Sequence, residues 1–346
     1  MNVTDRIKIL IVRGGGIGDI LLTIPALHVI KKYIPNCHIT FLSTWKKKGK
    51  SSPIPLLYEL DLIQDHLSIP FINKPSVFNY IELLQVIYSN RNKFHVSICL
   101  RHSLRGFLSR FIDYILFRVF LNAKAGIGFW NGSELSHLKF SNSDTFPMIQ
   151  EYKRLVHILG SEGFDINYNH LNTSFNQFIQ DRVKKIDVNL NYLDLGKRFI
   201  IICPFARDQK KKWSIENYIE LSKILIDNGL TIYIIGGRDE KEAGEEMIKL
   251  IGNNAINLCG QLTLVESAKL FEKCSLYIGN DTGPMHIAGL LNRPTVALFS
   301  KHSNPGKFSP MGNNNFIIRN EGDSINNISI PNVLKGVDKI FNINYE

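Results

Sequence analysis

Two aspartates, Asp19 and Asp281, follow predicted β-strands and stand at the starts of predicted helices, where side chains can do chemistry. Asp19 ends the glycine-rich loop 13–19, RGGGIGD, which follows an apolar strand. Glycines let a substrate approach the backbone closely, so Asp19 would be placed to accept a proton from an acceptor hydroxyl. Aspartate is also a favoured helix N-cap. The two roles are compatible, because one carboxylate oxygen can cap the helix while the other reacts.

The glycine loop does not match the common phosphate-binding motifs. The dinucleotide fingerprint G-x-G-x-x-G fits Gly14 and Gly16, but its third glycine would fall on Asp19. A Walker A loop starting at Gly14 also requires glycine at that position, followed by lysine. A carboxylate there would repel a phosphate bound at the helix N-terminus. The pattern therefore predicts that this loop does not hold a nucleotide phosphate.

The second candidate site is the segment 278–289, IGNDTGPMHIAG, which joins a predicted strand to a predicted helix. Thr282 and the backbone amides near Gly283 can cradle a diphosphate at the helix N-terminus, and His286 lies close enough to reach the same anion. Taken singly, Asp281 could be only a helix cap and His286 a surface histidine. The combination of these residue types in one turn argues against a purely structural role.

Strand and helix signals alternate along both halves of the chain. Continuous apolar runs are typical of parallel strands buried on both faces. We predict strands at 7–12, 38–42, 96–100, 199–203, 231–235, 275–278 and 295–299. We predict helices at 19–33, 150–159, 214–228, 240–251, 263–273 and 284–291. Two such series predict two doubly wound, Rossmann-like α/β domains with a cleft between them, where ligands would bind at the carboxyl ends of the strands.

The domain boundaries follow from composition. Residues 1–165 and 197–346 are predicted to be the two domains, because the stretch between them is polar and rich in asparagine. We expect residues 166–196 to be a linker with irregular structure. The last helix could pack back on the N-terminal domain. A chain of 346 residues is also longer than one hydrophobic core usually serves.

The overall charge describes partners rather than fold. With 41 basic and 31 acidic residues, the formal net charge is +10, which favours nucleotides, phosphorylated glycans, nucleic acid or an acidic membrane face. No nucleic-acid-binding motif accompanies the charge, so we expect no nucleic acid partner. The five scattered cysteines lack C-x-x-C spacing and predict free thiols in a reducing compartment. No apolar run suits a signal peptide or a membrane span, so we expect a cytoplasmic protein, with attachment to the cytoplasmic face of the inner membrane left open.

Several segments together resemble one enzyme family. They are RGGGIGDILLTIPALHVIKK at 13–32, KKWSIENYIEL at 211–221, IYIIGGRDEKEA at 232–243, GQLTLVESAKLFEKCSLYIGND at 260–281 and GNDTGPMHIAGLLNRPTVALFS at 279–300. The chain resembles glycosyltransferase family 9, the ADP-heptose:lipopolysaccharide heptosyltransferases. The resemblance implies the two-domain GT-B fold, with the acceptor on the N-terminal domain and the nucleotide on the C-terminal one. It also implies inverting, metal-independent transfer of a heptose from ADP-heptose to a lipopolysaccharide core acceptor.

The resemblance assigns roles to individual residues. Asp19 matches the general base that takes the proton from the acceptor hydroxyl. The donor diphosphate motif corresponds to Asp281, Thr282, Gly283 and His286. Negative charge grows on the departing diphosphate, so amides, hydroxyls and a cation must stabilise it without a metal.

The remaining donor contacts come from two loops. Lys212, just before Trp213, matches the family lysine, although Lys210 and Lys211 blur the register. Glu240 matches a carboxylate that binds the nucleotide ribose, with Asp239 as the rival candidate. The family commonly has small hydroxyl or glycine residues where this chain has CPFAR at 203–207, so donor contacts there are expected to differ.

The acceptor side rests on glycines and arginines. Gly16 and Gly18 would let the acceptor approach the backbone, and Arg101 and Arg105 are suited to its phosphate or carboxylate groups. The helical stretch 107–121 carries further arginines among apolar residues. It can rest on an anionic membrane face, or be a core helix with a solvated charged side. The basic loop 46–50 can be a mobile lid or simply solvated.

Two alternatives remain. One is a family relative that moves a different sugar, onto capsule or O-antigen glycan. The other is an inactive homologue that only binds a nucleotide or a glycan. Asp19 argues against the second, because a protein without the chemistry has no need for a carboxylate at a position that repels phosphate.

Overall fold

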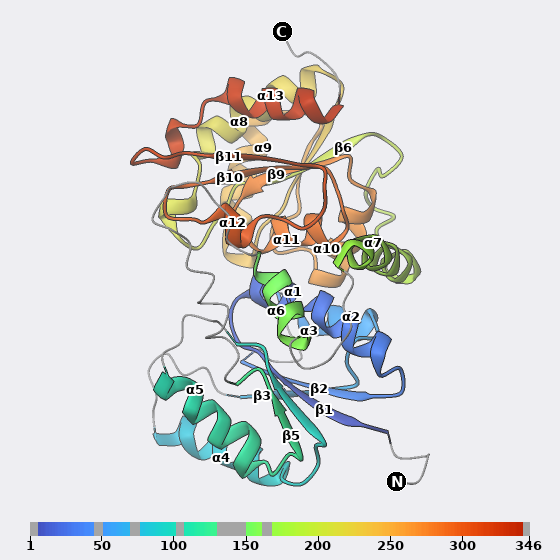
Figure 1. The fold of residues 1–346 in the computed structure, drawn as a ribbon. Helices are drawn as coiled ribbons and strands as arrows, with labels where there is room; N and C mark the ends of the chain where they lie inside the picture. The colour runs from blue at the N-terminus through green and yellow to red at the C-terminus, as the bar shows by residue number, and fades with distance from the viewer. Residues whose placement is uncertain are drawn as a thin grey trace. The chain divides into compact units, whose positions relative to one another are not determined.

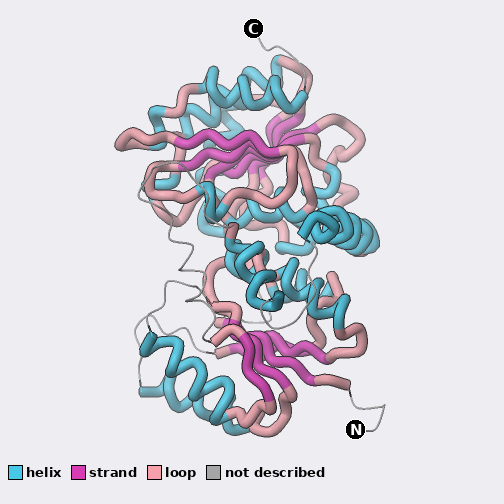
Figure 2. Tube along the Cα trace, in the orientation of Figure 1, coloured by secondary structure: helices cyan, strands magenta, loops and turns pink. Residues whose placement is uncertain are grey.

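The computed structural model describes residues 6–44, 51–69, 77–101, 107–129, 150–160 and 168–341. Backbone contacts divide the chain into two compact units, Met1–Leu171 and Asn172–Glu346. Each unit contains one parallel β-sheet with helices on both faces (Figures 1 and 2). The prediction of two doubly wound α/β domains is therefore confirmed.

The sheet of the first unit has, among the described residues, five parallel strands in the order β3-β2-β1-β4-β5. Their bounds are β1 Lys8–Val12, β2 His38–Ser43, β3 Asp65–Ser68, β4 Val96–Cys99 and β5 Ala125–Ile127. The central strand β1 is apolar and buried from Ile9 to Val12, because both of its faces are covered by helices.

Helices α1 Ile17–Leu21, α2 Ile24–Tyr33 and α6 Glu151–Gly160 lie on one face of this sheet, and α4 Val77–Ser89 and α5 Phe107–Tyr114 lie on the other (Figure 1). A π-helix, η1 Ile115–Phe120, continues α5, and α3 is Ile54–Glu59. The helix predicted at 19–33 is two helices. Pro25 has no N–H to donate to the carbonyl of Leu21, so the helix ends and restarts at Thr23.

The sheet of the second unit has, in the described part of the chain, six parallel strands in the order β11-β10-β9-β6-β7-β8. Their bounds are β6 Phe199–Cys203, β7 Thr231–Ile234, β8 Ala255–Asn257, β9 Leu276–Asn280, β10 Thr295–Phe299 and β11 Asn315–Arg319. The helices are η3 Gln209–Lys211, α8 Ile215–Asp227, η4 Arg238–Glu240, α9 Lys241–Ile251, α10 Leu264–Lys273, α11 Gly283–Leu290, α12 Pro305–Phe308, η5 Ile325–Asn327 and α13 Ile330–Phe341.

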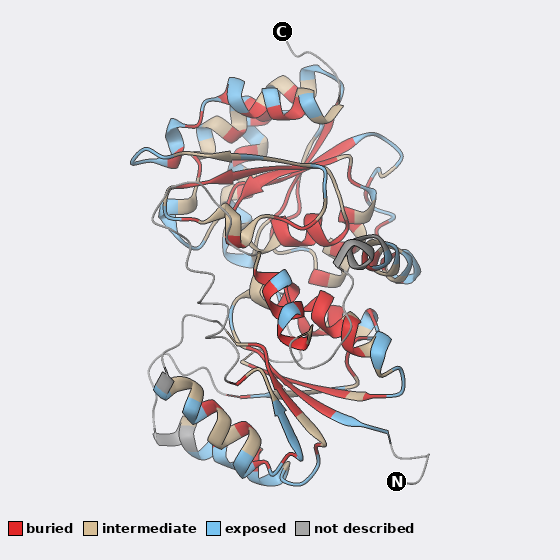
Figure 3. Cartoon of the chain, in the orientation of Figure 1, coloured by how far each residue is buried: buried red, intermediate tan, exposed pale blue. Residues whose placement is uncertain are grey.

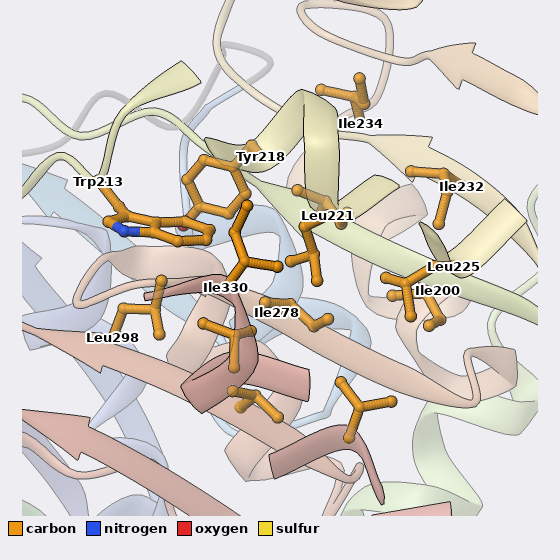
Figure 4. Close-up of a cluster of buried hydrophobic side chains, with 14 of the residues drawn as sticks. Ile200, Trp213, Tyr218, Leu221, Leu225, Ile232, Ile234, Ile278, Leu298 and Ile330 are labelled. Atoms are coloured by element: carbon orange, nitrogen blue, oxygen red, sulfur yellow. The ribbon is translucent and has the colours of Figure 1, made fainter. Parts of the chain in front are cut away.

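The core of the second unit lies between its sheet and helices α8, α9 and α13. Trp213 and Tyr218 are fully buried there, with their rings edge to face at 4.8 Å (Figure 4). The Trp213 indole N–H donates to the carbonyl of Ile328 at 2.9 Å, so the ring is buried without an unpaired donor. Fully burying an apolar side chain stabilises a fold by roughly 1.5–3 kcal/mol, so this cluster holds the strand ends rigidly.

The segment between the two predicted domains differs from its prediction. The polar segment 166–196 contains an 18-residue helix, α7 Tyr168–Lys185, where we expected irregular structure. Phe175, Ile179 and Val183, spaced four residues apart, form a buried stripe on this helix. Its C-terminus accepts hydrogen bonds from Lys269, which tie the helix into the second unit.

The last helix, α13, buries its apolar face in the core of its own unit. Val333 and Val337 belong to the same buried cluster as Trp213, and Arg198 lies 4.1 Å above the ring of Phe341. All five cysteines are buried and free. None of the described helices has both the length and the apolar character needed to cross a bilayer.

Candidate active site

Asp19 lies in the first turn of α1, directly after β1 and the glycine loop. Its Oδ2 accepts a hydrogen bond from the backbone N–H of Gly16 at 2.8 Å, and Gly16 is the N-cap residue of α1. Asp19 is therefore not the N-cap itself but the third helical residue, which reaches back to cap the first turn. Gly15 has φ of +126°, and a Cβ there would lie 2.5 Å from Asp19 Oδ2. The glycine loop thus folds closely around the carboxylate.

Arg13, the last residue before the glycines, holds the other side of Asp19. Its Nη2 lies 3.2 Å from Asp19 Oδ1, and its Nε donates to the Asp19 carbonyl at 3.3 Å. The Nη1 of the same guanidinium donates to the carbonyl of Leu100 and, at 3.3 Å, to Glu151 Oε1. The Arg13 side chain is fully buried, whereas that of Asp19 is 27% exposed. The Asp19 carboxylate is therefore fixed by Arg13 and Gly16, while part of it remains accessible to solvent.

Glu151, at the start of α6, completes a buried chain of charges with Arg154. Arg154 donates to both Glu151 oxygens, at 2.9 Å and 2.8 Å, and its Nη2 also donates to the carbonyl of Arg101 at 3.2 Å. Burial lowers the pKa of Arg13, and the carboxylates of Glu151 and Asp19 oppose that shift. A fully buried carboxylate between two guanidinium groups has its charge and its lone pairs satisfied.

Sequence reasoning missed the roles of Arg13 and Glu151. Arg13 was only the first letter of the glycine motif, and Glu151 only a position in a predicted helix. One signal was available: a charged residue directly after a buried parallel strand must find a partner. The partner itself, 138 residues away, could not be inferred from spacing.

The arginines expected to bind the acceptor are only partly placed. Arg101, after β4, pairs with Asp113 at 2.7 Å and lies 5.2 Å above the Phe117 ring, with 19% of its side chain exposed. Its predicted contact with the acceptor stays a prediction. Arg105 lies outside the described residues, as does the basic loop 46–50. Arg118 donates to the carbonyl of Lys124 at 2.9 Å.

In the second unit, Asn280 fastens the end of β9 to two neighbouring loops. Its side-chain oxygen accepts from the backbone N–H of Trp213 and from the Tyr218 hydroxyl, each at 3.2 Å, and its amide donates to the carbonyl of Pro204 at 3.0 Å. Asn280 is fully buried. The Asn280 side chain therefore links the loop that contains Pro204 and Trp213 to the turn that follows β9.

The turn after Asn280 carries the predicted diphosphate motif at the N-terminus of α11. Thr282 is the N-cap residue, Gly283 opens the helix and Pro284 lies in its first turn. The N–H groups of the first turn of any helix have no carbonyl partner within the helix, and Pro284, which has no N–H, is tolerated at this position. His286 is buried within α11, so the reading of a surface histidine is wrong.

The structure brings Lys211, rather than Lys212, to this turn. Lys211 Nζ lies 2.6 Å from Asp281 Oδ2, and the Lys211 side chain is 29% exposed. Lys212 Nζ lies instead 5.7 Å from the centre of the Phe205 ring. Asp208 accepts from the Lys210 N–H at 3.0 Å and starts the 3₁₀ turn η3, which sets this register.

Glu240 lies against the glycine pair that follows β7. A Cβ on Gly237 would lie 2.6 Å from Glu240 Oε2, so a larger residue there would displace the carboxylate from this backbone. Asp239, the rival candidate, is exposed, whereas Glu240 is half-buried. Among the residues that the structure describes, no cluster of three or more His, Cys, Asp or Glu side chains could hold a metal ion.

The chain is similar in sequence to known proteins. The family described as glycosyltransferase family 9 (heptosyltransferase) matches residues 117–337. Lipooligosaccharide heptosyltransferase 2 from Haemophilus ducreyi is 26% identical over 331 residues, which cover 90% of this chain and 88% of that protein.

Solved structures show the same fold. Escherichia coli ADP-heptose lps heptosyltransferase II superposes with a TM-score of 0.67 at 20% identity, over 96% of this chain and 98% of that one. E. coli heptosyltransferase WaaC with ADP superposes with a TM-score of 0.70 at 16% identity, over 96% and 100% of the two chains. Two parallel α/β units of this kind define the GT-B fold. More narrowly, the chain belongs to glycosyltransferase family 9.

Proposed function

We propose that this enzyme transfers a heptose from ADP-heptose to a lipopolysaccharide core acceptor, with inversion and without a metal ion. The observation that carries the proposal is Asp19, a partly exposed carboxylate held on one oxygen by Gly16 and on the other by Arg13. The name of the Haemophilus ducreyi relative, a lipooligosaccharide heptosyltransferase, supports the choice of sugar and acceptor.

In the proposed reaction, Asp19 acts as the general base. The acceptor hydroxyl gives its proton to the Asp19 carboxylate while its oxygen forms a bond to the anomeric carbon of the donor. The bond from that carbon to the diphosphate oxygen breaks, and ADP leaves with the electron pair. Because attack and departure occur on opposite faces of the sugar, the anomeric configuration inverts. Arg13 acts as a positioning residue, since it touches Asp19 rather than the reacting atoms.

The departing diphosphate is assigned to the N-terminus of α11. The Thr282 hydroxyl and the first amides of the helix would bind its oxygens, and Lys211 would supply the positive charge. Asp281 keeps the Lys211 ammonium at this turn by an ion pair of 2.6 Å. We therefore replace Lys212 by Lys211 as the proposed phosphate ligand, and we assign the ribose hydroxyls to Glu240.

Calorimetric binding of ADP, UDP, GDP and CMP, with and without EDTA, tests the donor half of the proposal. We expect ADP to bind at least about tenfold more tightly than the others, with no effect of EDTA. Preference for another nucleotide would support the alternative of a different nucleotide sugar. Absence of binding would support an inactive homologue, and loss of binding in EDTA would overturn metal independence.

Transfer itself is tested with ADP-heptose and a soluble core oligosaccharide as acceptor. We expect a product linked with inverted configuration, detected by mass spectrometry and proton NMR. The buried free thiols support a reducing compartment, so we place this reaction in the cytoplasm.

A further inference from the structure

Tyr277 lies within β9, the strand that leads into the turn carrying Asp281 and Thr282. Its side chain is fully buried, and its ring centre lies 5.5 Å from that of Phe271 on α10. Strand β9 and the body of α11 are buried around it (Figure 3). The Tyr277 hydroxyl is closed off from solvent, so it requires a hydrogen-bond partner inside the protein.

The Tyr277 ring extends along its own strand towards the carboxyl end. Gly279 is two residues further on and therefore on the same side of β9. A Cβ on Gly279 would collide with the Tyr277 hydroxyl, and it would also lie 3.0 Å from the carbonyl oxygen of Cys203. Because glycine has no side chain, the tyrosine hydroxyl reaches the end of the strand, where the turn before α11 begins.

The hydroxyl has no hydrogen-bond partner within the part of the chain that the structure describes. Tyr218 and Tyr233 are equally buried in the same unit, and both of their hydroxyls are paired, at 3.2 Å and 3.1 Å. Burial raises the pKa of Tyr277 well above its ordinary value, and the nearby Thr282 hydroxyl opposes that rise. An unpaired buried hydroxyl destabilises a fold, so this one calls for an explanation.

The Thr282 hydroxyl is turned away from the position where it would serve the donor. It donates to the carbonyl of Asn280 at 3.3 Å, which is long for a hydroxyl donor. Thr282 is the N-cap residue of α11, yet its side chain makes no capping hydrogen bond. A diphosphate at the helix N-terminus would offer this proton a charged and therefore stronger acceptor. With its proton directed there, the threonine oxygen can accept a hydrogen bond from Tyr277.

We propose that Tyr277 is a positioning residue for the donor diphosphate, donating to the Thr282 hydroxyl when that hydroxyl donates to the diphosphate. The inference rests on the proposed function, which assigns the diphosphate to the N-terminus of α11. The Tyr277 hydroxyl is unpaired in the free protein and gains its partner in the complex. Successive hydrogen bonds polarise one another, so Thr282 should bind the negative charge more firmly.

Tyr277→Phe, which removes only the hydroxyl oxygen, tests the proposal through two measurements. The unfolding temperature should equal or exceed that of the wild type, because an unpaired buried hydroxyl is gone. ADP should bind about tenfold more weakly in calorimetry, because the Thr282 hydroxyl loses its donor. The matched control Tyr233→Phe removes a hydroxyl that donates to the carbonyl of Asp194. It should show the opposite pattern, with a lower unfolding temperature and unchanged ADP affinity.

A double-mutant cycle with Thr282→Val identifies the partner of the Tyr277 hydroxyl. In the valine background, Tyr277→Phe should change ADP affinity by less than about twofold, because no threonine oxygen is left to accept. Thr282→Ser retains a hydroxyl and should restore the effect of Tyr277→Phe. With ADP-heptose, Tyr277→Phe should also lower kcat by about tenfold, since charge on the diphosphate grows as it departs.

Two results would overturn the proposal: unchanged ADP affinity in Tyr277→Phe, or an equal loss of affinity in the threonine and valine backgrounds. A lower unfolding temperature with unchanged affinity would assign the Tyr277 hydroxyl a purely structural role. A wild-type protein that binds ADP but transfers no heptose would contradict the proposed function, and the affinity cycle would still decide the role of Tyr277.

Discussion

The two units place an aspartate in the same kind of position, yet they hold it in opposite ways. Asp19 and Asp281 each follow a central β-strand at the start of a helix, and each faces a cation. Arg13 is fully buried, and its guanidinium also binds the carbonyl of Leu100 and the carboxylate of Glu151. Lys211 is 29% exposed on a flexible stem.

Arg13 and Lys211 therefore differ in how firmly each can hold the aspartate that it faces. A planar guanidinium that donates to several acceptors fixes the carboxylate beside it, which suits a base that must meet its substrate in one orientation. A lysine ammonium on an exposed side chain can turn from Asp281 to a diphosphate as charge develops there. In the proposed mechanism, the first unit would therefore hold its base rigidly, and the second would supply a cation that can turn from Asp281 to the diphosphate.

Asp19→Asn should have the largest effect. We expect kcat to fall by about 10²–10⁴-fold, because an amide cannot take the acceptor proton. Binding of ADP, measured by calorimetry, should not change. Asparagine caps a helix about as well as aspartate, but an amide loses the ion pair with Arg13. Unfolding in urea should therefore show a loss of about 1–3 kcal/mol. Near-normal kcat would exclude Asp19 as the base.

Replacing the two lysines separately should distinguish their roles. Lys211→Met is expected to lower kcat by about 10²-fold, because the charge that meets the leaving diphosphate is lost. Lys212→Met, the matched control one residue along, should stay within about threefold of the wild type, since Lys212 lies over Phe205. Steady-state kinetics with ADP-heptose measures both. The reverse order of effects would return the role to Lys212.

Glu151→Gln should lower kcat by about tenfold through Arg13, because the charge between two guanidinium groups is gone. It should also reduce the free energy of unfolding by about 3–5 kcal/mol, as expected when a buried ion pair loses one partner. Affinity for ADP should be unchanged. Urea denaturation with kcat measurements tests this.

The double variant Glu151→Gln/Arg154→Gln serves as the control for that prediction. It removes the uncompensated Arg154 charge as well, so it should be less destabilised than the sum of the single variants. Equal stability of Glu151→Gln and the wild type would mean that the buried pair does not hold the base.

The smallest expected effect is a loss of folding stability at low pH. It should arise in the first unit, which contains Asp19. Burial, with the nearby Lys32 adding to it, lowers the pKa of His28 on α2 from 6.5 to about 4. The unfolded chain binds this proton first, so His28 favours folding above pH 6.5, and that contribution is lost as the pH falls towards 4. His28→Gln should flatten the dependence of Tm on pH across this window. An unchanged slope would contradict the prediction.

Sequence patterns predicted the central strands of the two sheets but not the edge strands. Strand β6 coincides with its prediction at 199–203, because a run such as FIIIC is buried on both faces. The edge strand β3 reads DHLS and is partly exposed, so no apolar run marks it. Helix α7 was hidden by a polar composition, although Phe175, Ile179 and Val183 had helical spacing. Periodicity would have found it where composition did not.

The features of the site also divide into local ones, which the sequence could predict, and long-range ones, which it could not. The turns that carry Asp19 and Asp281 are local, so consecutive residue types were enough to predict them. The contact between Arg13 and Glu151 joins positions 138 residues apart and depends on the tertiary fold. The choice between Lys211 and Lys212 depends on the single 3₁₀ turn η3, and a shift of one residue reverses which ammonium faces Asp281.

The buried cysteines make the protein convenient for covalent labelling. Burial raises the pKa of Cys203 and of Cys274 to about 12, and it also raises those of Cys37 and Cys259. Reagents that attack thiolates should therefore react slowly with the native protein. A cysteine introduced at Leu108, which is 70% exposed, would be the preferred target. An environment-sensitive fluorophore attached there would report, in real time, whether helix α5 moves from water into a less polar environment.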